Sequence, residues 1–140
     1  MKNKRYKPLV DKLFYIITVP TIIFLAVMTV ISAFEPLSLI IMIPADMFTL
    51  YFLISPLFGY VELREQSLFI KFGFIIKREI PYNKIRSTTK ERSFISETML
   101  SLKNSFEHVK IKYNTYDVTT VSVTDNDDLI NELDWRYKQK

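Results

Sequence analysis

The chain has 140 residues, of which 49% are hydrophobic, with a formal net charge of +4 and a mean hydropathy of +0.10. It has no cysteine and only two glycines, Gly59 and Gly73, which excludes disulfides, thiolate metal sites, cysteine nucleophiles and glycine-rich phosphate-binding loops. The apolar residues are concentrated in the first 58 positions, so we expect two physically different parts in one chain.

Residues 1–12 are interpreted as a basic cytoplasmic tail. Its charge comes from Lys2, Lys4, Arg5, Lys7 and Lys12. The single acid in this segment is Asp11, so its net charge is +4. Because an apolar run follows at once, the pattern indicates juxtamembrane charge and argues against a nucleic-acid-binding surface.

Residues 13–34 and 37–58 are two apolar runs of 22 residues each. A helix needs roughly 20 apolar residues to cross about 30 Å of hydrocarbon. Only Glu35 and Pro36 separate the runs, which predicts an antiparallel transmembrane hairpin over residues 13–58. The alternatives are buried helices of a globular core and a cleavable signal peptide. Both runs exceed the length of roughly 18 residues that marks a spanning helix, which argues against core helices. The first run is also longer than the apolar region of a signal peptide, and no A-x-A cleavage pattern follows it.

The distribution of Lys and Arg predicts the orientation of this hairpin. Basic residues precede the first run and follow the second, whereas the turn at Glu35 has none. Cytoplasmic loops are the basic ones, so we expect a two-pass protein of the cell membrane with both termini, and the domain of residues 59–140, in the cytoplasm.

Asp46 is the one charged residue within either apolar run. An ionised carboxylate at the centre of a span costs roughly 2.5–3.5 kcal/mol on insertion scales. Matching depths in an antiparallel pair places Asp46 opposite Leu25, with Thr21 and Thr29 one turn to either side. Two interpretations stay open: a proton-linked, ligand-binding or oligomer contact, or a protonated acid hydrogen-bonded to threonine or to a carbonyl freed by proline.

From residue 60 onward, apolar and polar residues alternate, which predicts strands. We expect strands over residues 60–64, 68–72 and 74–80, with Gly73 as a turn, and a hairpin of residues 107–113 and 116–123. Residues 90–98 are polar and are expected to form a loop. Thr124 and Asp127 fit a capping box for a C-terminal helix. The apolar stripe of that helix is Leu129, Ile130, Leu133 and Tyr137.

Three short motifs resemble those of bacterial pleckstrin-homology-like (PH-like) domains, specifically the YyaB-like small membrane proteins. They are L-x-I-x-x-G at residues 68–73, I-P-Y-x-x-I at residues 80–85 and an A-L-S-L-like segment at residues 99–102. The resemblance covers about residues 60–137. It implies an α+β domain with a PH-like antiparallel β-sheet or barrel capped by a C-terminal helix. It also implies immunity to self-made bacteriocins. Residues 123–125 depart from the Ser-Pro that the family often has before the helix.

The sequence offers no catalytic, cofactor or metal site. His108 is the one histidine, and we expect it on the exposed face of a strand. The acids at residues 125, 127 and 128 are interpreted as helix caps and not as a cation site. The chain is therefore predicted not to be an enzyme.

A basic stretch follows the second apolar run. The candidates for contact with anionic lipid headgroups are Lys71, Lys77, Arg78, Lys84 and Arg86. Each basic residue near a membrane surface contributes about 1 kcal/mol. The alternative is a set of ordinary solvated strand faces.

These observations favour a non-enzymatic, membrane-anchored PH-like module that binds a protein, peptide or lipid at the inner leaflet. Bacteriocin immunity is what the family resemblance adds. An accessory subunit of a membrane transporter or enzyme complex is the alternative, and a purely structural membrane tether is a third hypothesis.

Overall fold

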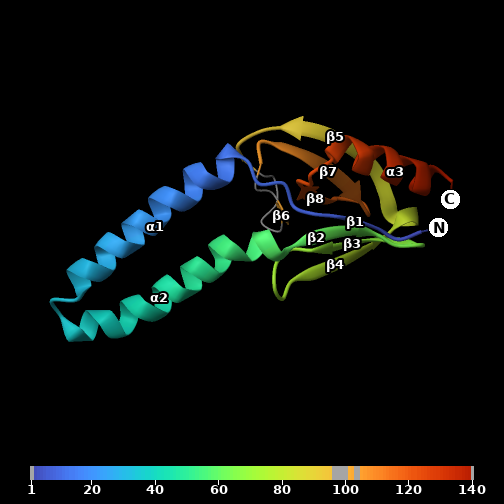
Figure 1. Ribbon diagram of the computed structural model, residues 1–140. Helices are drawn as coiled ribbons and strands as arrows, with labels where there is room; N and C mark the ends of the chain where they lie inside the picture. The colour runs from blue at the N-terminus through green and yellow to red at the C-terminus, as the bar shows by residue number, and fades with distance from the viewer. Residues whose placement is uncertain (1, 96–100, 103–104, 140) are drawn as a thin grey trace.

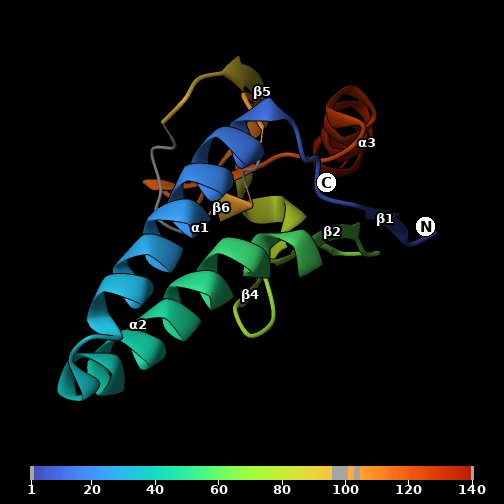
Figure 2. The ribbon, with the colours of Figure 1, turned by 60° about the vertical axis from the view of Figure 1, so that its left-hand side comes forward.

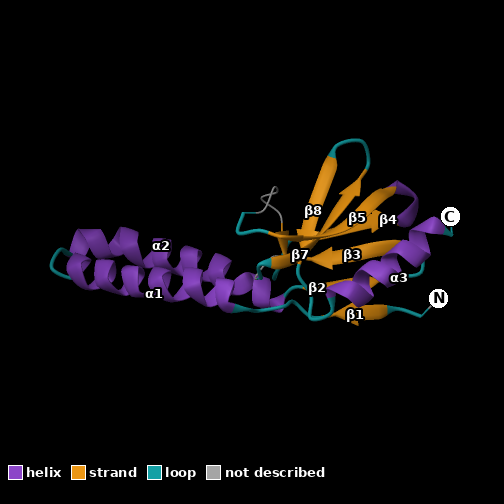
Figure 3. Cartoon of the chain, turned by 90° about the horizontal axis from the view of Figure 1, so that it is seen from above, coloured by secondary structure: helices purple, strands orange, loops and turns teal. Residues whose placement is uncertain are grey.

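The computed structural model describes residues 2–95, 101–102 and 105–139. A pair of long helices extends from one end of a two-sheet domain, and both chain termini lie at the opposite end (Figure 1). Seen from above, the two helices extend side by side away from the sheets (Figure 3).

The first helix, α1, spans Lys12–Ser32, and the second, α2, spans Pro36–Ile54 and continues into the 3-10 helix η1 at Ser55–Phe58. Asp11 caps α1, since its side chain accepts a hydrogen bond from the Leu13 amide at 2.8 Å. Both helices are long and apolar enough to cross a membrane, and only 6% and 0% of their apolar windows are buried. They are therefore not the buried core helices that the sequence left as an alternative.

Two four-stranded sheets form the domain. The first sheet has the order β1-β2-β3-β4 and is antiparallel throughout. Its strands are Lys4–Tyr6, Tyr60–Leu63, Ser67–Lys71 and Lys77–Pro81. The second sheet has the order β5-β7-β8-β6, in which β6 runs parallel to β8. Its strands in chain order are Ile85–Arg92 (β5), Ser101–Leu102 (β6), Glu107–Tyr113 (β7) and Asp117–Val121 (β8), and η2 at Tyr82–Lys84 joins the sheets.

The core lies between the sheets and the C-terminal helix α3, Asn126–Lys138. The predicted stripe of α3 is confirmed, because Leu129 and Leu133 are fully buried and Ile130 and Tyr137 pack against the core. Figure 2 shows α3 beside the sheets and away from the two long helices. Helix α3 packs on β5 of the second sheet and is hydrogen-bonded to β1 of the first, so it covers the gap between the two sheets.

Three parts of the predicted secondary structure are wrong. Residues 90–92 belong to β5 and not to a loop; of the rest of the predicted loop, residues 96–98 lie outside the described residues. Residues 74–76 form the turn before β4, which begins only at Lys77. The cap of α3 is Asp125, whose side chain accepts from the Asp128 amide at 2.9 Å. The Thr124 amide instead donates to the carbonyl of Lys7.

His108 is also misplaced by the sequence prediction, because its side chain is buried. Lys110, Thr120 and Ser122 lie on the same face of the β7–β8 pair and are buried too. The outer face of the β7–β8 pair is therefore shielded from solvent. The alternation of residues along a strand separates its two faces but does not show that both are buried. The Nε2 atom of His108 lies 3.8 Å from a carboxylate oxygen of Glu91.

Candidate functional site

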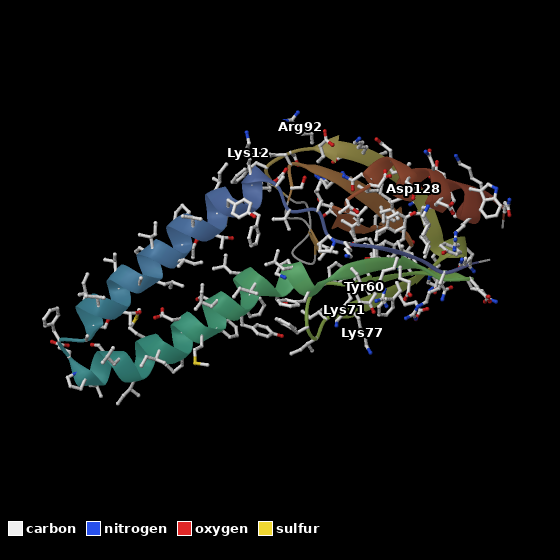
Figure 4. All side chains as sticks on the ribbon, viewed as in Figure 1. Lys12, Tyr60, Lys71, Lys77, Arg92 and Asp128 are labelled. Atoms are coloured by element: carbon white, nitrogen blue, oxygen red, sulfur yellow. The ribbon has the colours of Figure 1, made fainter. Side chains whose placement is uncertain are left out.

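A surface hollow of about 640 Å³ lies on the outer face of the first sheet, at its helix end. We call it the sheet hollow. It is lined by Tyr60, Arg64, Phe69, Lys71, Phe74, Ile75, Lys77, Arg78 and Glu79. Figure 4 shows Tyr60, Lys71 and Lys77 close to the end of α2.

Strand register explains why Tyr60, Lys71 and Lys77 share one face, whereas Arg78 pairs with Ile70 and reaches the hollow from the strand edge. Tyr60 pairs with Lys71 across β2 and β3, and Lys71 pairs with Lys77 across β3 and β4. Directly paired residues point to the same side of a sheet, and successive residues alternate between the two sides. The neighbours Val61 and Ile70 therefore face the core and are fully buried.

Aromatic rings and cations are stacked along this face. The Arg5 guanidinium lies 4.0 Å from the ring centroid of Tyr60, and that of Arg64 lies 3.9 Å from the ring centroid of Phe69. Such contacts stabilise the cation by about 0.5–1 kcal/mol at exposed sites. Neither arginine is among the site residues expected from the sequence. The alternation of aromatic and basic residues on the outward positions is the signal that would have found Arg64.

The charges within the hollow are unevenly compensated. Arg64 forms ion pairs with Glu62 at 3.3 Å and Glu79 at 3.4 Å. A hydrogen bond from the Ser67 hydroxyl, together with Arg64, lowers the pKa of Glu79 below its ordinary value. Among the residues that the structure describes, Lys71 and Lys77 have no ion pair within 4.0 Å. Two unpaired lysines directly opposite each other repel, so this position favours an anion.

The hollow ends at an exposed apolar turn, residues 74–76. The Phe74 ring stacks between Tyr51 of α2 and Phe58 of η1, with centroid distances of 5.4 Å and 4.6 Å. Its amide donates to the Ser55 hydroxyl at 3.3 Å. The next residue, Ile75, is 76% exposed. The turn is thus fixed against the end of the second helix while its tip stays open.

The structure divides the five predicted basic residues into two groups. Lys71, Lys77 and Arg78 line the sheet hollow. Lys84 lies instead with Asn114 in a second hollow of about 250 Å³, which Arg78 also lines. Arg86 donates to the carbonyl of Thr115 at 2.8 Å in that same region. The side chain of Arg78 also contacts the hydroxyl of Tyr113.

In the hairpin, one of the two predicted threonines meets Asp46. The hydroxyl of Thr29 contacts a carboxylate oxygen of Asp46 and lies 2.9 Å from the carbonyl oxygen of Leu25. Thr21 instead donates to the carbonyl of Ile17 at 2.7 Å, within its own helix. The second carboxylate oxygen of Asp46, Oδ1, is buried without a partner among the described residues.

A family model described as a bacterial PH domain matches residues 59–136, more than half of the chain. The chain belongs to this family. The match covers β2 to β8 and most of α3, and it includes every residue that lines the sheet hollow. We use the name PH domain for the two sheets together with α3. Strand β1 and the two long helices precede the matched residues.

Two further comparisons add little to the family assignment. No curated protein matches the chain. Among solved structures, the chain is similar to the crystal structure of the C-terminal domain of an unknown protein from Leishmania infantum, with 15% sequence identity and a TM-score of 0.41. That likeness covers 57% of this chain and 68% of the other. It is too low to inform the function of the PH domain.

Proposed function

We propose that the chain is a membrane-anchored, non-catalytic PH-domain binding module, held by the α1–α2 hairpin with both termini in the cytoplasm. The observation that carries this proposal is the pairing of β1 with β2. Strand β1 precedes α1 and β2 follows α2, so both ends of the hairpin join neighbouring strands of one sheet. Two helices that cross a bilayer from one folded domain have to return to the side from which they left.

Single-cysteine variants test this topology cleanly, because the natural chain has no cysteine. In intact cells, a membrane-impermeant maleimide should label Glu35→Cys, in the turn between the helices. It should label Lys84→Cys, in the PH domain, only after the membrane is opened. Labelling of Lys84→Cys in intact cells contradicts the proposed orientation.

The ligand of this module is proposed to bind at the sheet hollow. Its unpaired Lys71 and Lys77, beside exposed aromatic and aliphatic side chains, suit an amphipathic anion such as a phospholipid headgroup with its chains, or an acidic apolar peptide.

If the chain is such a binding module, the resemblance of the sequence to YyaB-like proteins favours a role in bacteriocin immunity. A domain without catalytic groups protects by occupancy: it masks a receptor or sequesters the peptide at the bilayer, and a membrane tether raises its local concentration there. Expression of the full chain in a sensitive strain should raise resistance to peptides of the producing strain. The variant Lys71→Glu with Lys77→Glu should lose that resistance at equal abundance. No protection by the full chain would remove the immunity hypothesis and leave the binding module.

An accessory subunit of a membrane transporter or enzyme complex is the second candidate. The unpartnered Asp46 oxygen in the hairpin favours it, because a polar atom in an apolar helix pair is satisfied by another helix. A membrane protein that co-purifies with the natural chain but not with Asp46→Leu supports this candidate, whereas equal co-purification contradicts it.

A further inference from the structure

We propose that the PH domain is seated on the bilayer by two apolar tips, one on each side of the hairpin, which enter the headgroup region of the leaflet that the helices cross. The first tip is the turn of residues 74–76, and the second is formed by Phe94 and Ile95. The occupant of both tips is an anionic phospholipid surface. This inference rests on the proposed membrane anchoring and adds how the domain meets the lipid.

The depth of the first tip follows from its ring contacts. Tyr51 lies inside α2, near its end, and its ring packs against Phe74. The turn of residues 74–76 therefore lies beside the last helical turns of α2 and not beyond the end of the helix. If α2 crosses the bilayer, Phe74 lies at the hydrocarbon boundary, where aromatic rings are enriched. Ile75 and Ile76, exposed by 76% and 45%, project next to it.

The second tip lies at the start of the other helix. Asp11, which caps α1, accepts the Phe106 amide at 3.0 Å through its second oxygen. The carbonyl of Phe106 in turn accepts from the Ser93 amide at 3.1 Å. Phe94 and Ile95, 59% and 78% exposed, follow directly. This chain of hydrogen bonds places them at the first turn of α1, whose 21 residues span about 31 Å, the thickness of a hydrocarbon core.

Each tip has two cations beside it. Lys71 and Lys77 line the sheet hollow together with Phe74 and Ile75 of the first tip. Lys12 and Arg92 lie near the start of α1 (Figure 4), and Arg92 is two residues before Phe94 of the second tip. All four are at least partly exposed. Apolar side chains that enter the acyl boundary, with Lys and Arg at the phosphate level, are the pattern of interfacial membrane binding. The repulsion between Lys71 and Lys77 is relieved when a lipid phosphate lies between them.

Single-tryptophan variants test the proposal in the full chain. The one natural tryptophan, Trp135 on α3, is replaced by phenylalanine. Tryptophan is then placed at Ile75, at Ile95, at Met47 in the middle of α2, or at Tyr116. Tyr116 is 91% exposed in the β7–β8 turn, and strand register puts this turn at the far end of the domain, beside the start of β5. Each protein is reconstituted into phosphatidylcholine vesicles with or without phosphatidylglycerol, using acyl chains that carry bromine as the quencher.

We expect brominated lipid to quench Met47→Trp, Ile75→Trp and Ile95→Trp, and aqueous acrylamide to quench Tyr116→Trp. Phosphatidylglycerol should strengthen the quenching at Ile75→Trp. Replacing Lys71 and Lys77 by glutamine should abolish that strengthening, and the matched change at Lys84 and Arg86 should leave it intact.

The outcomes separate this inference from the proposed function. Loss of lipid quenching at Met47→Trp contradicts the membrane hairpin itself. Quenching at Met47→Trp, with Ile75→Trp and Ile95→Trp as open to acrylamide as Tyr116→Trp, overturns only the seating by the two tips. Protection of Ile75→Trp from both quenchers indicates a protein interface at this position and also overturns the proposal.

Discussion

The guanidinium of Arg136, in the last helix, donates a hydrogen bond of 3.0 Å to the carbonyl oxygen of Lys2, at the start of the chain. The same side chain donates to the carbonyl of Arg64 at 3.0 Å. The Arg136 side chain is only 5% exposed, although arginine is usually found on the protein surface. Arg136 thus ties α3 to both β1 and the end of β2.

We predict that Arg136→Ala lowers the unfolding free energy of the PH domain by about 2–3 kcal/mol, because charged hydrogen bonds are lost and a buried acceptor is left unpaired. Thermal unfolding of the detergent-solubilised chain, followed by the fluorescence of Trp135, measures the loss. Lys138→Ala, which removes an exposed ion pair with Asp134 and a distant contact with the Tyr137 ring, is the control and should change little. Equal effects of the two variants would contradict the role of Arg136.

A second prediction concerns acid sensitivity at the β1–α3 contact. Hydrogen bonds from Lys4, first, and from the Tyr6 hydroxyl lower the pKa of Asp128 below its ordinary value. A carboxyl group with a lowered folded-state pKa adds stability above its unfolded pKa of about 3.9 and loses it as the pH falls through the folded value. The protection of the Tyr6 amide against hydrogen exchange, relative to an unfolded chain at the same pH, should therefore fall below about pH 4. In Asp128→Asn this protection should be lower at neutral pH and lack the acid step.

The third prediction tests the joint between the turn and α2. A methyl group added at Gly73, where φ is +157°, would meet the Ser55 hydroxyl oxygen at 1.9 Å and its Cβ at 3.1 Å. Gly73→Ala should destabilise the domain by about 1–3 kcal/mol. Combining it with Ser55→Ala should recover part of this loss, since the nearest clashing atom is removed. A double variant that is additive in thermal unfolding would show that the contact does not matter.

The fourth prediction concerns the polar contact within the hairpin. Thr29→Val keeps the side-chain volume but removes the hydroxyl that meets Asp46, and should weaken the helix pair by about 1 kcal/mol. Thr21→Val is the matched control, because Thr21 bonds only within α1. Asp46→Asn retains a hydrogen-bonding side chain and should keep the abundance of the protein in membranes. Abundance and resistance to denaturation in detergent measure all three, and equal losses at the two threonines would refute the contact.

The sequence predicts those elements in which apolar and polar residues alternate or form a helical stripe, namely β2, β3, β7, β8 and α3. Burial follows this alternation in β2, whereas both faces of β3, β7 and β8 carry buried residues. Strand β5 is not predicted by periodicity because it is rich in polar and charged residues. The apolar run at residues 74–76 predicts a buried strand, whereas here these side chains point outward.

For the candidate site, sequence alone could group Lys71, Lys77 and Arg78 by their closeness in the chain, but it grouped Lys84 and Arg86 with them for the same reason. Only the turn at η2, which carries the chain from one sheet to the other, separates the two sets. The depth match between Thr29 and Asp46 followed from antiparallel geometry. The choice between the two threonines depends on helix rotation, which spacing does not give.

Strand β1 is the feature with the widest consequence. It is only three residues long and carries two cations in the segment interpreted as a tail, yet it completes the first sheet and contributes the buried Tyr6. Strand β1 precedes the hairpin in the chain, whereas β2 and Arg136 follow it. The pairing of β1 with β2 therefore forms only after both helices have been made and their outer ends brought together. In the proposed membrane topology, bilayer insertion is thus a step within the folding of the domain, and a fragment that starts at Tyr60 begins with an open sheet edge.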